Sequence, residues 1–175
     1  AITEMGGKNA VIVTQNAELD ETVSGILYSA FGHAGQKCSA LSRVIVHHSL
    51  KEKLIERLKE AATDLKVGKA FDLETTVNPI ISIEDKERLQ RQAKEAALEA
   101  SKFNGRVVID RSAEDLPGNC VGPVIIELPF ERAFDKDSFA TKELFGPVLH
   151  IIGFDQLDDA IKLFNGTEYA LTGGV

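Results

Sequence analysis

The sequence of 175 residues has no long hydrophobic run and no excess of positive charge. No stretch approaches the roughly 18 consecutive apolar residues that a membrane-spanning helix needs. The formal net charge of −7 argues against nonspecific binding to nucleic acid or to an anionic membrane surface, because such binding needs clustered lysine and arginine. The first residues do not combine a basic segment with an apolar one, so no export signal is visible.

Cysteine is also scarce. The two cysteines, Cys38 and Cys120, are far apart in the sequence and do not form a disulfide framework. This favours a reducing, intracellular setting, and we expect a cytoplasmic protein. We predict that Cys120, which has no candidate base near it in the sequence, is a packed or inert thiol.

Two phosphate-binding signatures are missing. No Gly-x-Gly-x-x-Gly occurs, and the Lys8 that follows Gly7 precedes Asn9 rather than the Ser or Thr of a P-loop. We also predict no metal site: His47 and His48 are expected on one strand, where adjacent side chains point to opposite faces.

What is present is typical of a globular domain, with 43% hydrophobic and 27% charged residues. Apolar runs predict strands at 10–13, 43–47, 106–110, 124–128 and 147–152, and helical spacing predicts helices at 19–31, 50–65, 84–102 and 157–164. This alternation predicts an α/β domain, a three-layer open sheet with parallel strands and flanking helices.

The first strand, helix and strand predict a parallel pair joined by a crossover. Glu4 lies just before the first of these strands and Cys38 just before the second, so both should fall at the same edge of the sheet. A thiol in the glycine-containing loop 31–40 could be a nucleophile, with Glu4 as its activating base. It could equally be a small buried core residue, and Glu4 a solvated surface carboxylate.

Four segments indicate a family. They read EMGGKN at 4–9, GQKC at 35–38, KELFGPV at 142–148 and NGTEYALTGG at 165–174. In type and order they resemble signature segments of the aldehyde dehydrogenase superfamily, and Glu4 and Cys38 are 34 positions apart, as in that family. The sequence GQKCSALSR is most similar to the Δ1-pyrroline-5-carboxylate dehydrogenases of proline catabolism, which also occur within a bifunctional proline-utilisation protein.

The resemblance implies a reaction and two catalytic residues. Such enzymes oxidise L-glutamate γ-semialdehyde to L-glutamate with NAD. Cys38 would attack the aldehyde carbon, and hydride transfer would leave a thioester on its sulfur. Glu4 would activate the water that hydrolyses this thioester. The Cys38 backbone N–H would stabilise the oxyanion together with an asparagine of the cofactor domain.

The resemblance also implies binding residues. Glu143 would bond to the nicotinamide ribose, Phe145 would pack near the nicotinamide ring, and the main chain of Met5 would contact the carboxamide. Ser39, directly after the thiol, is the residue that the resemblance ties to the glutamate semialdehyde substrate.

Members of this family carry further parts that the sequence does not contain. We therefore expect residues 1–175 to be the catalytic domain, with the N-terminal NAD-binding domain and the C-terminal end absent. The partners expected are a small aldehyde, the NAD-binding domain of the same polypeptide and, for the full-length parent, further copies of itself. We expect the 175-residue chain alone to have little or no dehydrogenase activity.

Three other functions remain open. A related enzyme could pass the thioester to coenzyme A or phosphate, although Glu4 favours hydrolysis. A structural or interaction protein could keep the fold without the reaction. A cysteine hydrolase would need a histidine base near Cys38, and no matching motif occurs.

Overall fold

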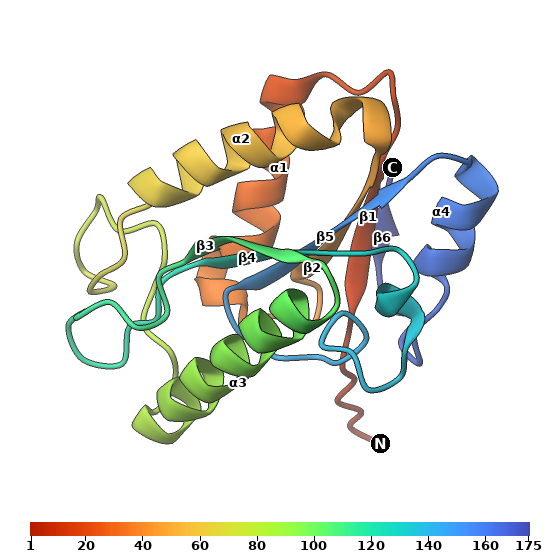
Figure 1. Cartoon of the computed structure of the whole chain (residues 1–175). Helices are drawn as coiled ribbons and strands as arrows, with labels where there is room; N and C mark the ends of the chain where they lie inside the picture. Colours follow the sequence, from red (N-terminus) through yellow and green to blue (C-terminus); the bar gives the residue numbers. More distant parts are fainter.

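The computed structural model describes residues 1–175 and contains one mixed sheet between two helical layers (Figure 1). The strands are β1 Asn9–Val13, β2 Leu41–His47, β3 Arg106–Asp110, β4 Val124–Leu128, β5 Val148–Phe154 and β6 Gly173–Gly174. The helices are α1 Leu19–Phe31, α2 His48–Asp64, α3 Ile83–Lys102 and α4 Leu157–Phe164, with short 3-10 segments at Gly32–Gly35 and Arg132–Phe134.

The spatial order of the strands is β3-β4-β5-β2-β1-β6. β1 pairs in parallel with β2, as the crossover pattern predicts, and β2 with β5 and β5 with β4 are parallel too. The predicted α/β sheet with flanking helices is confirmed, with one refinement. β3 at the sheet edge runs antiparallel to β4, because the connection from Asp110 to Val124 contains no crossover helix.

The helices cover both faces of the sheet. α1 and α2 lie side by side on one face, and α3 and α4 lie on the other (Figure 1). All seven residues of β5 are buried, as expected for a central strand covered on both sides. None of the helices combines the length and the apolar composition that crossing a membrane would require.

One predicted boundary is wrong. His48 is not a strand residue but the first residue of α2. The reason is local, because the Nδ1 of His47 accepts the Ser49 N–H at 3.2 Å and so caps the helix one residue after the strand. The side chain of His48 instead lies 3.0 Å from Asp155. No group of three or more His, Cys, Asp or Glu side chains is placed to hold a metal ion.

Candidate active site

The Cys38 thiol lies in a tight turn between the 3-10 segment Gly32–Gly35 and β2. The Ala40 N–H donates to the Lys37 carbonyl at 3.0 Å, which places Cys38 and Ser39 at the two central positions of the turn. Both central residues are exposed. The alternative that Cys38 is a buried core residue is therefore wrong.

The backbone just before this turn is in an unfavourable conformation. His33, Ala34 and Gly35 have φ angles of 55°, 54° and 68°, which lie in the left-handed region. This region costs a residue with a side chain roughly 1–2 kcal/mol, and such residues stay there only where surrounding contacts hold them. The conformation of the Cys38 turn must therefore be maintained by contacts with other segments.

Gly35 and Gln36 provide two of these contacts. A Cβ at Gly35 would overlap the carbonyl of Gly146, so only glycine allows the loop to approach the 142–148 segment this closely. The Gln36 side chain donates from Nε2 to the Pro79 carbonyl at 3.1 Å and accepts the Ile81 N–H at 2.9 Å. These bonds attach the loop to the chain that precedes α3.

Asn9, the first residue of β1, holds the turn from the opposite side. Its side-chain Nδ2 donates to the carbonyls of both Cys38 and Ala40, each at 2.8 Å. Its Oδ1 accepts the Thr172 N–H at 3.2 Å. Asn9 is only 5% exposed, so the amide joins three segments inside the protein.

Glu143 lies against the glycines of the first segment. Its Oε1 accepts the Gly7 N–H at 2.9 Å. A Cβ at Gly6 would overlap Glu143 Oε2, and one at Gly7 would overlap the Cys38 carbonyl. The two glycines thus allow the first segment to pack directly between the Cys38 turn and the Glu143 segment.

The structure brings the residues predicted for catalysis and binding to one open pocket of about 520 Å³. Six of its lining residues are Glu4, Met5, Cys38, Ser39, Glu143 and Phe145. The expected shared edge of Glu4 and Cys38 is thus found, since both precede neighbouring parallel strands. Phe145 is 43% exposed and has a φ of 53°, so its ring is presented at the pocket rather than packed in the core.

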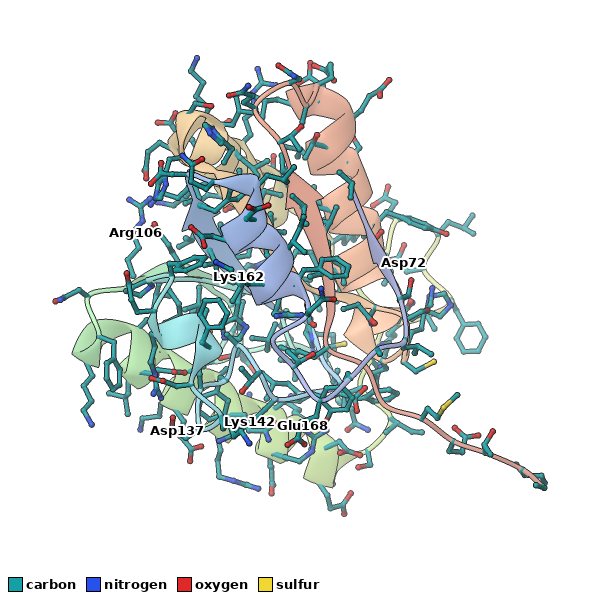
Figure 2. All side chains as sticks on the ribbon, turned by 90° about the vertical axis from the view of Figure 1, so that its right-hand side faces the viewer. Asp72, Arg106, Asp137, Lys142, Lys162 and Glu168 are labelled. Carbon is teal, nitrogen blue, oxygen red and sulfur yellow. The ribbon has the colours of Figure 1, made fainter.

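Glu4 is attached much less firmly than Cys38. Residues 1–5 are exposed and belong to no helix or strand, and the ribbon leaves the body of the protein there (Figures 1 and 2). No hydrogen bond or ion pair involves the Glu4 carboxylate. The pocket therefore contains one firmly held side and one loosely held side.

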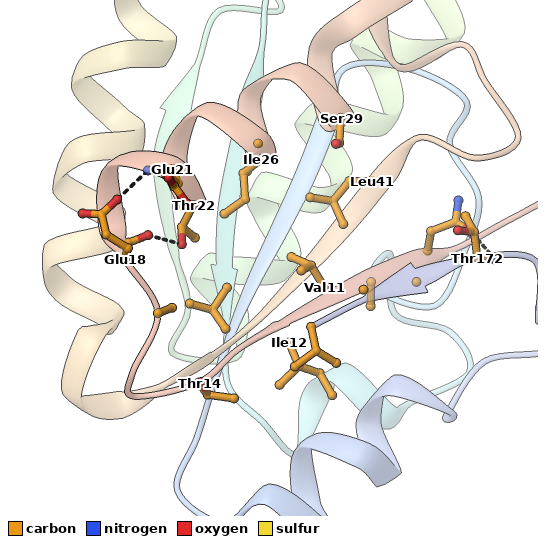
Figure 3. Close-up of a pocket in the computed structure, with 18 of the residues that line it drawn as sticks. Val11, Ile12, Thr14, Glu18, Glu21, Thr22, Ile26, Ser29, Leu41 and Thr172 are labelled. Atoms are coloured by element: carbon orange, nitrogen blue, oxygen red, sulfur yellow. Dashed lines mark hydrogen bonds between the residues drawn. The ribbon is translucent and has the colours of Figure 1, made fainter.

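A larger cavity of about 700 Å³ lies beside the candidate site, between β1, α1 and β6 (Figure 3). β1 contributes mainly apolar residues to its lining, and α1 contributes polar ones such as Glu21, Thr22 and Ser29. It shares Ser39 with the smaller pocket but is not lined by Cys38, Glu4 or Glu143. The predicted catalytic residues Cys38 and Glu4 therefore line the smaller pocket and not this cavity.

Three buried basic residues under the site were not singled out in the sequence. Lys8 and Arg43 are each 2% exposed, and His150 is fully buried. Arg43 donates to the carbonyls of Lys8, Leu163 and Phe164, at 3.2, 2.9 and 3.0 Å. Lys8 Nζ and both ring nitrogens of His150 have no hydrogen-bond partner.

Burial governs the protonation of this basic cluster. Burial, with a smaller contribution from the charge of Arg43, lowers the pKa of Lys8 to about 7, while Glu143 and Glu99 oppose the shift. Burial also lowers the pKa of His150 well below its usual value, with smaller contributions from Lys8 and Arg43. A charged Arg43 within the apolar run of β2, and a histidine within β5, were the available sequence signals.

The arrangement has a definite chemical capability. An exposed thiol in a backbone turn and a carboxylate in the same open pocket suit nucleophilic attack followed by base-assisted hydrolysis. The other thiol lacks these features, since Cys120 is 1% exposed, its Sγ lies 3.5 Å from the Gly68 carbonyl, and burial raises its pKa.

The fold and the pocket define an α/β domain that presents a thiol at the amino ends of parallel strands. The model of the aldehyde dehydrogenase family matches residues 1–175, and the chain belongs to this family. It is 35% identical over 174 residues to a 1-pyrroline-5-carboxylate dehydrogenase of Staphylococcus haemolyticus. That match covers 99% of this chain but only 32% of the relative, so the chain spans about a third of the length of this curated relative.

Two solved structures are similar in fold to this chain. Proline utilization A from Bdellovibrio bacteriovorus, inactivated by N-propargylglycine, superposes with a TM-score of 0.85 at 38% identity, covering 98% of this chain and 17% of that one. Betaine aldehyde dehydrogenase from Staphylococcus aureus in complex with NAD+ gives a TM-score of 0.84 at 29% identity, covering 98% and 34%. The fold of this chain is therefore the fold of the corresponding part of these two proteins.

Proposed function

We propose that this chain is the catalytic domain of an NAD-dependent aldehyde dehydrogenase that oxidises L-glutamate γ-semialdehyde, in equilibrium with Δ1-pyrroline-5-carboxylate, to L-glutamate. The single observation that carries the proposal is the meeting of Cys38, Glu4 and Glu143 at one open pocket. The substrate assignment is supported by the relatives, because one is named a 1-pyrroline-5-carboxylate dehydrogenase and another a proline utilization A.

Cys38 would act as the nucleophile. Its thiolate sulfur forms a bond to the aldehyde carbon, and the carbonyl oxygen becomes an oxyanion that the Cys38 backbone N–H can stabilise. Loss of a hydride from this carbon converts the thiohemiacetal into a thioester. The exposed turn suits this step, because a substrate can approach both the sulfur and the backbone N–H.

Glu4 would complete the reaction. As a general base it takes a proton from water, whose oxygen then attacks the thioester carbon and releases the carboxylic acid and the Cys38 thiol. The carboxylate borders the same pocket as the Cys38 sulfur, which suits a base that acts on the thioester.

Glu143 and its neighbours fit the nicotinamide end of NAD. Glu143 Oε1 is already bonded to the Gly7 N–H, and Oε2 remains as an acceptor for a ribose hydroxyl. The exposed ring of Phe145 and the exposed main chain at Met5 flank this carboxylate in the pocket. When bound, NAD accepts the hydride, and these residues would hold the ribose and the nicotinamide beside Cys38.

Ser39 would contribute to substrate choice. It is exposed, lies next to the nucleophile in the turn, and borders both the active-site pocket and the larger cavity. Its hydroxyl is therefore placed to bond with a polar end of the substrate, such as the α-carboxylate or amino group of glutamate semialdehyde.

The complete protein would supply the remaining parts. A further domain would bind the rest of NAD and provide a second oxyanion donor, and we expect the parent protein to form homo-oligomers in the cytoplasm. We propose that the 175-residue chain by itself produces little or no NADH.

An enzyme that transfers the acyl group to coenzyme A or to phosphate is the second candidate. The presence of Glu4 at the pocket favours water as the acceptor. The product decides between them: the complete enzyme should release free glutamate, and an acyl-coenzyme A or acyl-phosphate product would overturn the assignment.

The main test is kinetic and uses the full-length parent. Cys38→Ala should abolish NADH formation from glutamate semialdehyde, whereas Cys120→Ala should retain it. The parent should prefer glutamate semialdehyde over simple aliphatic aldehydes in kcat/KM. Equal activity on simple aldehydes would contradict the proposed substrate assignment. Full activity of the Cys38→Ala variant would contradict the proposed role of Cys38 as the nucleophile.

A further inference from the structure

The Asn9 side-chain amide bonds to the Cys38 turn through its nitrogen and to the 165–175 segment through its oxygen. Its two N–H groups reach the carbonyls of Cys38 and Ala40, and its oxygen accepts from Thr172. From this geometry we propose that Asn9 is a positioning residue, which fixes the two peptide groups that carry the Cys38 and Ala40 carbonyls and thereby orients the Cys38 thiol. The inference rests on the proposed function and specifies how its nucleophile is held.

The bonds of Asn9 act on the part of the turn that matters for chemistry. Ser39 and Ala40 lie between the peptide groups that carry these two carbonyls, so anchoring both carbonyls leaves the backbone of these two residues little freedom to rotate. The orientation of a turn determines where its central side chains and N–H groups point. A change at Asn9 should therefore displace the Cys38 sulfur and N–H together, although Asn9 itself is buried behind them.

The sheet explains why a side chain is needed here. The pairing of β1 with β2 shifts by one residue between Asn9 and Ala10, because Asn9 pairs with Leu41 and Ala10 with Arg43. Ser42 is the extra residue, and its Oγ donates to the Asn9 carbonyl at 3.3 Å. Such irregularities interrupt the regular ladder, and the Asn9 amide supplies hydrogen bonds at the point where the turn joins the sheet.

The chemistry of the contact is demanding. Two donors and one acceptor on a short side chain are available from asparagine, while aspartate has the acceptor but no donor and serine has a single hydroxyl. Asn9→Asp therefore keeps the bond from Thr172 and loses both bonds to the turn. This difference separates positioning of the turn from simple anchoring of the 165–175 segment.

The first experiment measures thiol reactivity in the 175-residue chain. Iodoacetamide labelling of Cys38 is followed by mass spectrometry from pH 6 to pH 10, and the buried Cys120 reports unfolding in the same sample. We expect Asn9→Asp and Asn9→Ala each to change the rate of Cys38 labelling about fivefold within this pH range. Cys120 should remain protected in both variants. The control Asn16→Asp, an identical change at the exposed turn after β1, should stay within about twofold.

Each other result has a defined meaning. Unchanged Cys38 reactivity in both Asn9 variants would overturn the proposal, as would an effect of Asn9→Ala that is absent from Asn9→Asp. If Cys120 becomes labelled in one of these variants, that variant has unfolded, and Asn9→Ser is measured in its place. Unfolding of all three variants beside a folded Asn16→Asp would assign Asn9 to fold stability alone and would also overturn the proposal.

The second experiment uses the full-length parent and glutamate semialdehyde. Asn9→Asp should lower kcat by about 10- to 100-fold, because misplacing a reacting group by about 1 Å has this order of effect, while KM for NAD should stay within threefold. A rise in the KM for NAD or for the semialdehyde, with kcat unchanged, would overturn the proposal. If the wild-type parent does not oxidise the semialdehyde, the proposed function fails, but the labelling experiment still decides the role of Asn9.

Discussion

The two segments that would supply the catalytic groups are held in opposite ways. The Cys38 turn is attached by the side chains of Asn9 and Gln36 and by the close contact of Gly35 with Gly146. The segment 1–5 that carries Glu4 is exposed, without bonds from its carboxylate. The difference shows that contacts from distant segments fix the thiol within this domain, whereas the carboxylate borders the same pocket without such contacts.

The largest effect should come from the firmly held side, at Gly35. In Gly35→Ala the new methyl group would overlap the Gly146 backbone, and the φ of 68° would be unfavourable. We expect the free energy of unfolding to fall by about 4 kcal/mol in urea titrations. Gly25→Ala in α1, where the added carbon would meet nothing within 4 Å beyond the helix's own backbone, is the control and should stabilise by up to about 1 kcal/mol. Equal stability of the two variants would remove the evidence for a fixed turn.

The second effect should be a pH dependence of the stability of the chain, caused by Lys8, which lies where residues 1–5 lead into the core. With a folded pKa of about 7 and an ordinary pKa of 10.5, the unfolded chain binds more protons between these values. The contribution of Lys8 to stability therefore rises with pH in this window and is least favourable below pH 7.

We expect the difference in unfolding free energy between wild type and Lys8→Met to shift by about 3 kcal/mol in favour of wild type from pH 6 to pH 9. Denaturant titrations at several pH values measure this shift. The control Lys59→Met, on the exposed side of α2, should show no such trend. If the difference in unfolding free energy between wild type and Lys8→Met does not change with pH, Lys8 is not held in the apolar interior.

A smaller effect is expected at Gln36. Gln36→Ala removes the bonds to the Pro79 carbonyl and the Ile81 N–H and should destabilise the chain by about 1–2 kcal/mol. Amide hydrogen exchange should also accelerate in residues 79–82 and in the turn. Gln15→Ala, at an exposed position after β1, serves as the comparison. Unaltered exchange in both segments would show that Gln36 does not connect them.

The smallest effect on stability should come from the loosely held side. Glu4→Gln should change the free energy of unfolding by less than about 0.5 kcal/mol, because the carboxylate makes no bond in the folded chain. In the full-length parent the same variant should slow thioester hydrolysis, visible as a burst of NADH followed by a slow steady state. A large loss of stability in Glu4→Gln would contradict the absence of stabilising contacts from the Glu4 carboxylate. A normal steady-state rate of NADH formation without a burst would contradict the role of Glu4 as the base.

Much of the fold could be predicted from local patterns. The β-branched run of β1 and the helical spacing of α1 identified the first strand and helix, and the crossover rule then placed Glu4 and Cys38 at one edge. The antiparallel β3 was not predicted, because strand direction at a sheet edge depends on the path of a long connection. The cap formed by His47 was missed because a histidine nitrogen is an uncommon acceptor at a helix start.

The sequence by itself determined the order of strands and helices, the family, and the pair of segments that meet at the pocket. Hydrophobic periodicity and short motifs are local properties, and they can be read without knowing the fold. Only the tertiary structure decided that Cys38 is exposed while Cys120 is buried, that the Asn9 amide holds the nucleophile turn, and that Lys8 and His150 are buried without partners. These features depend on which distant segments come into contact, and hydrogen bonding and desolvation act only once those contacts exist.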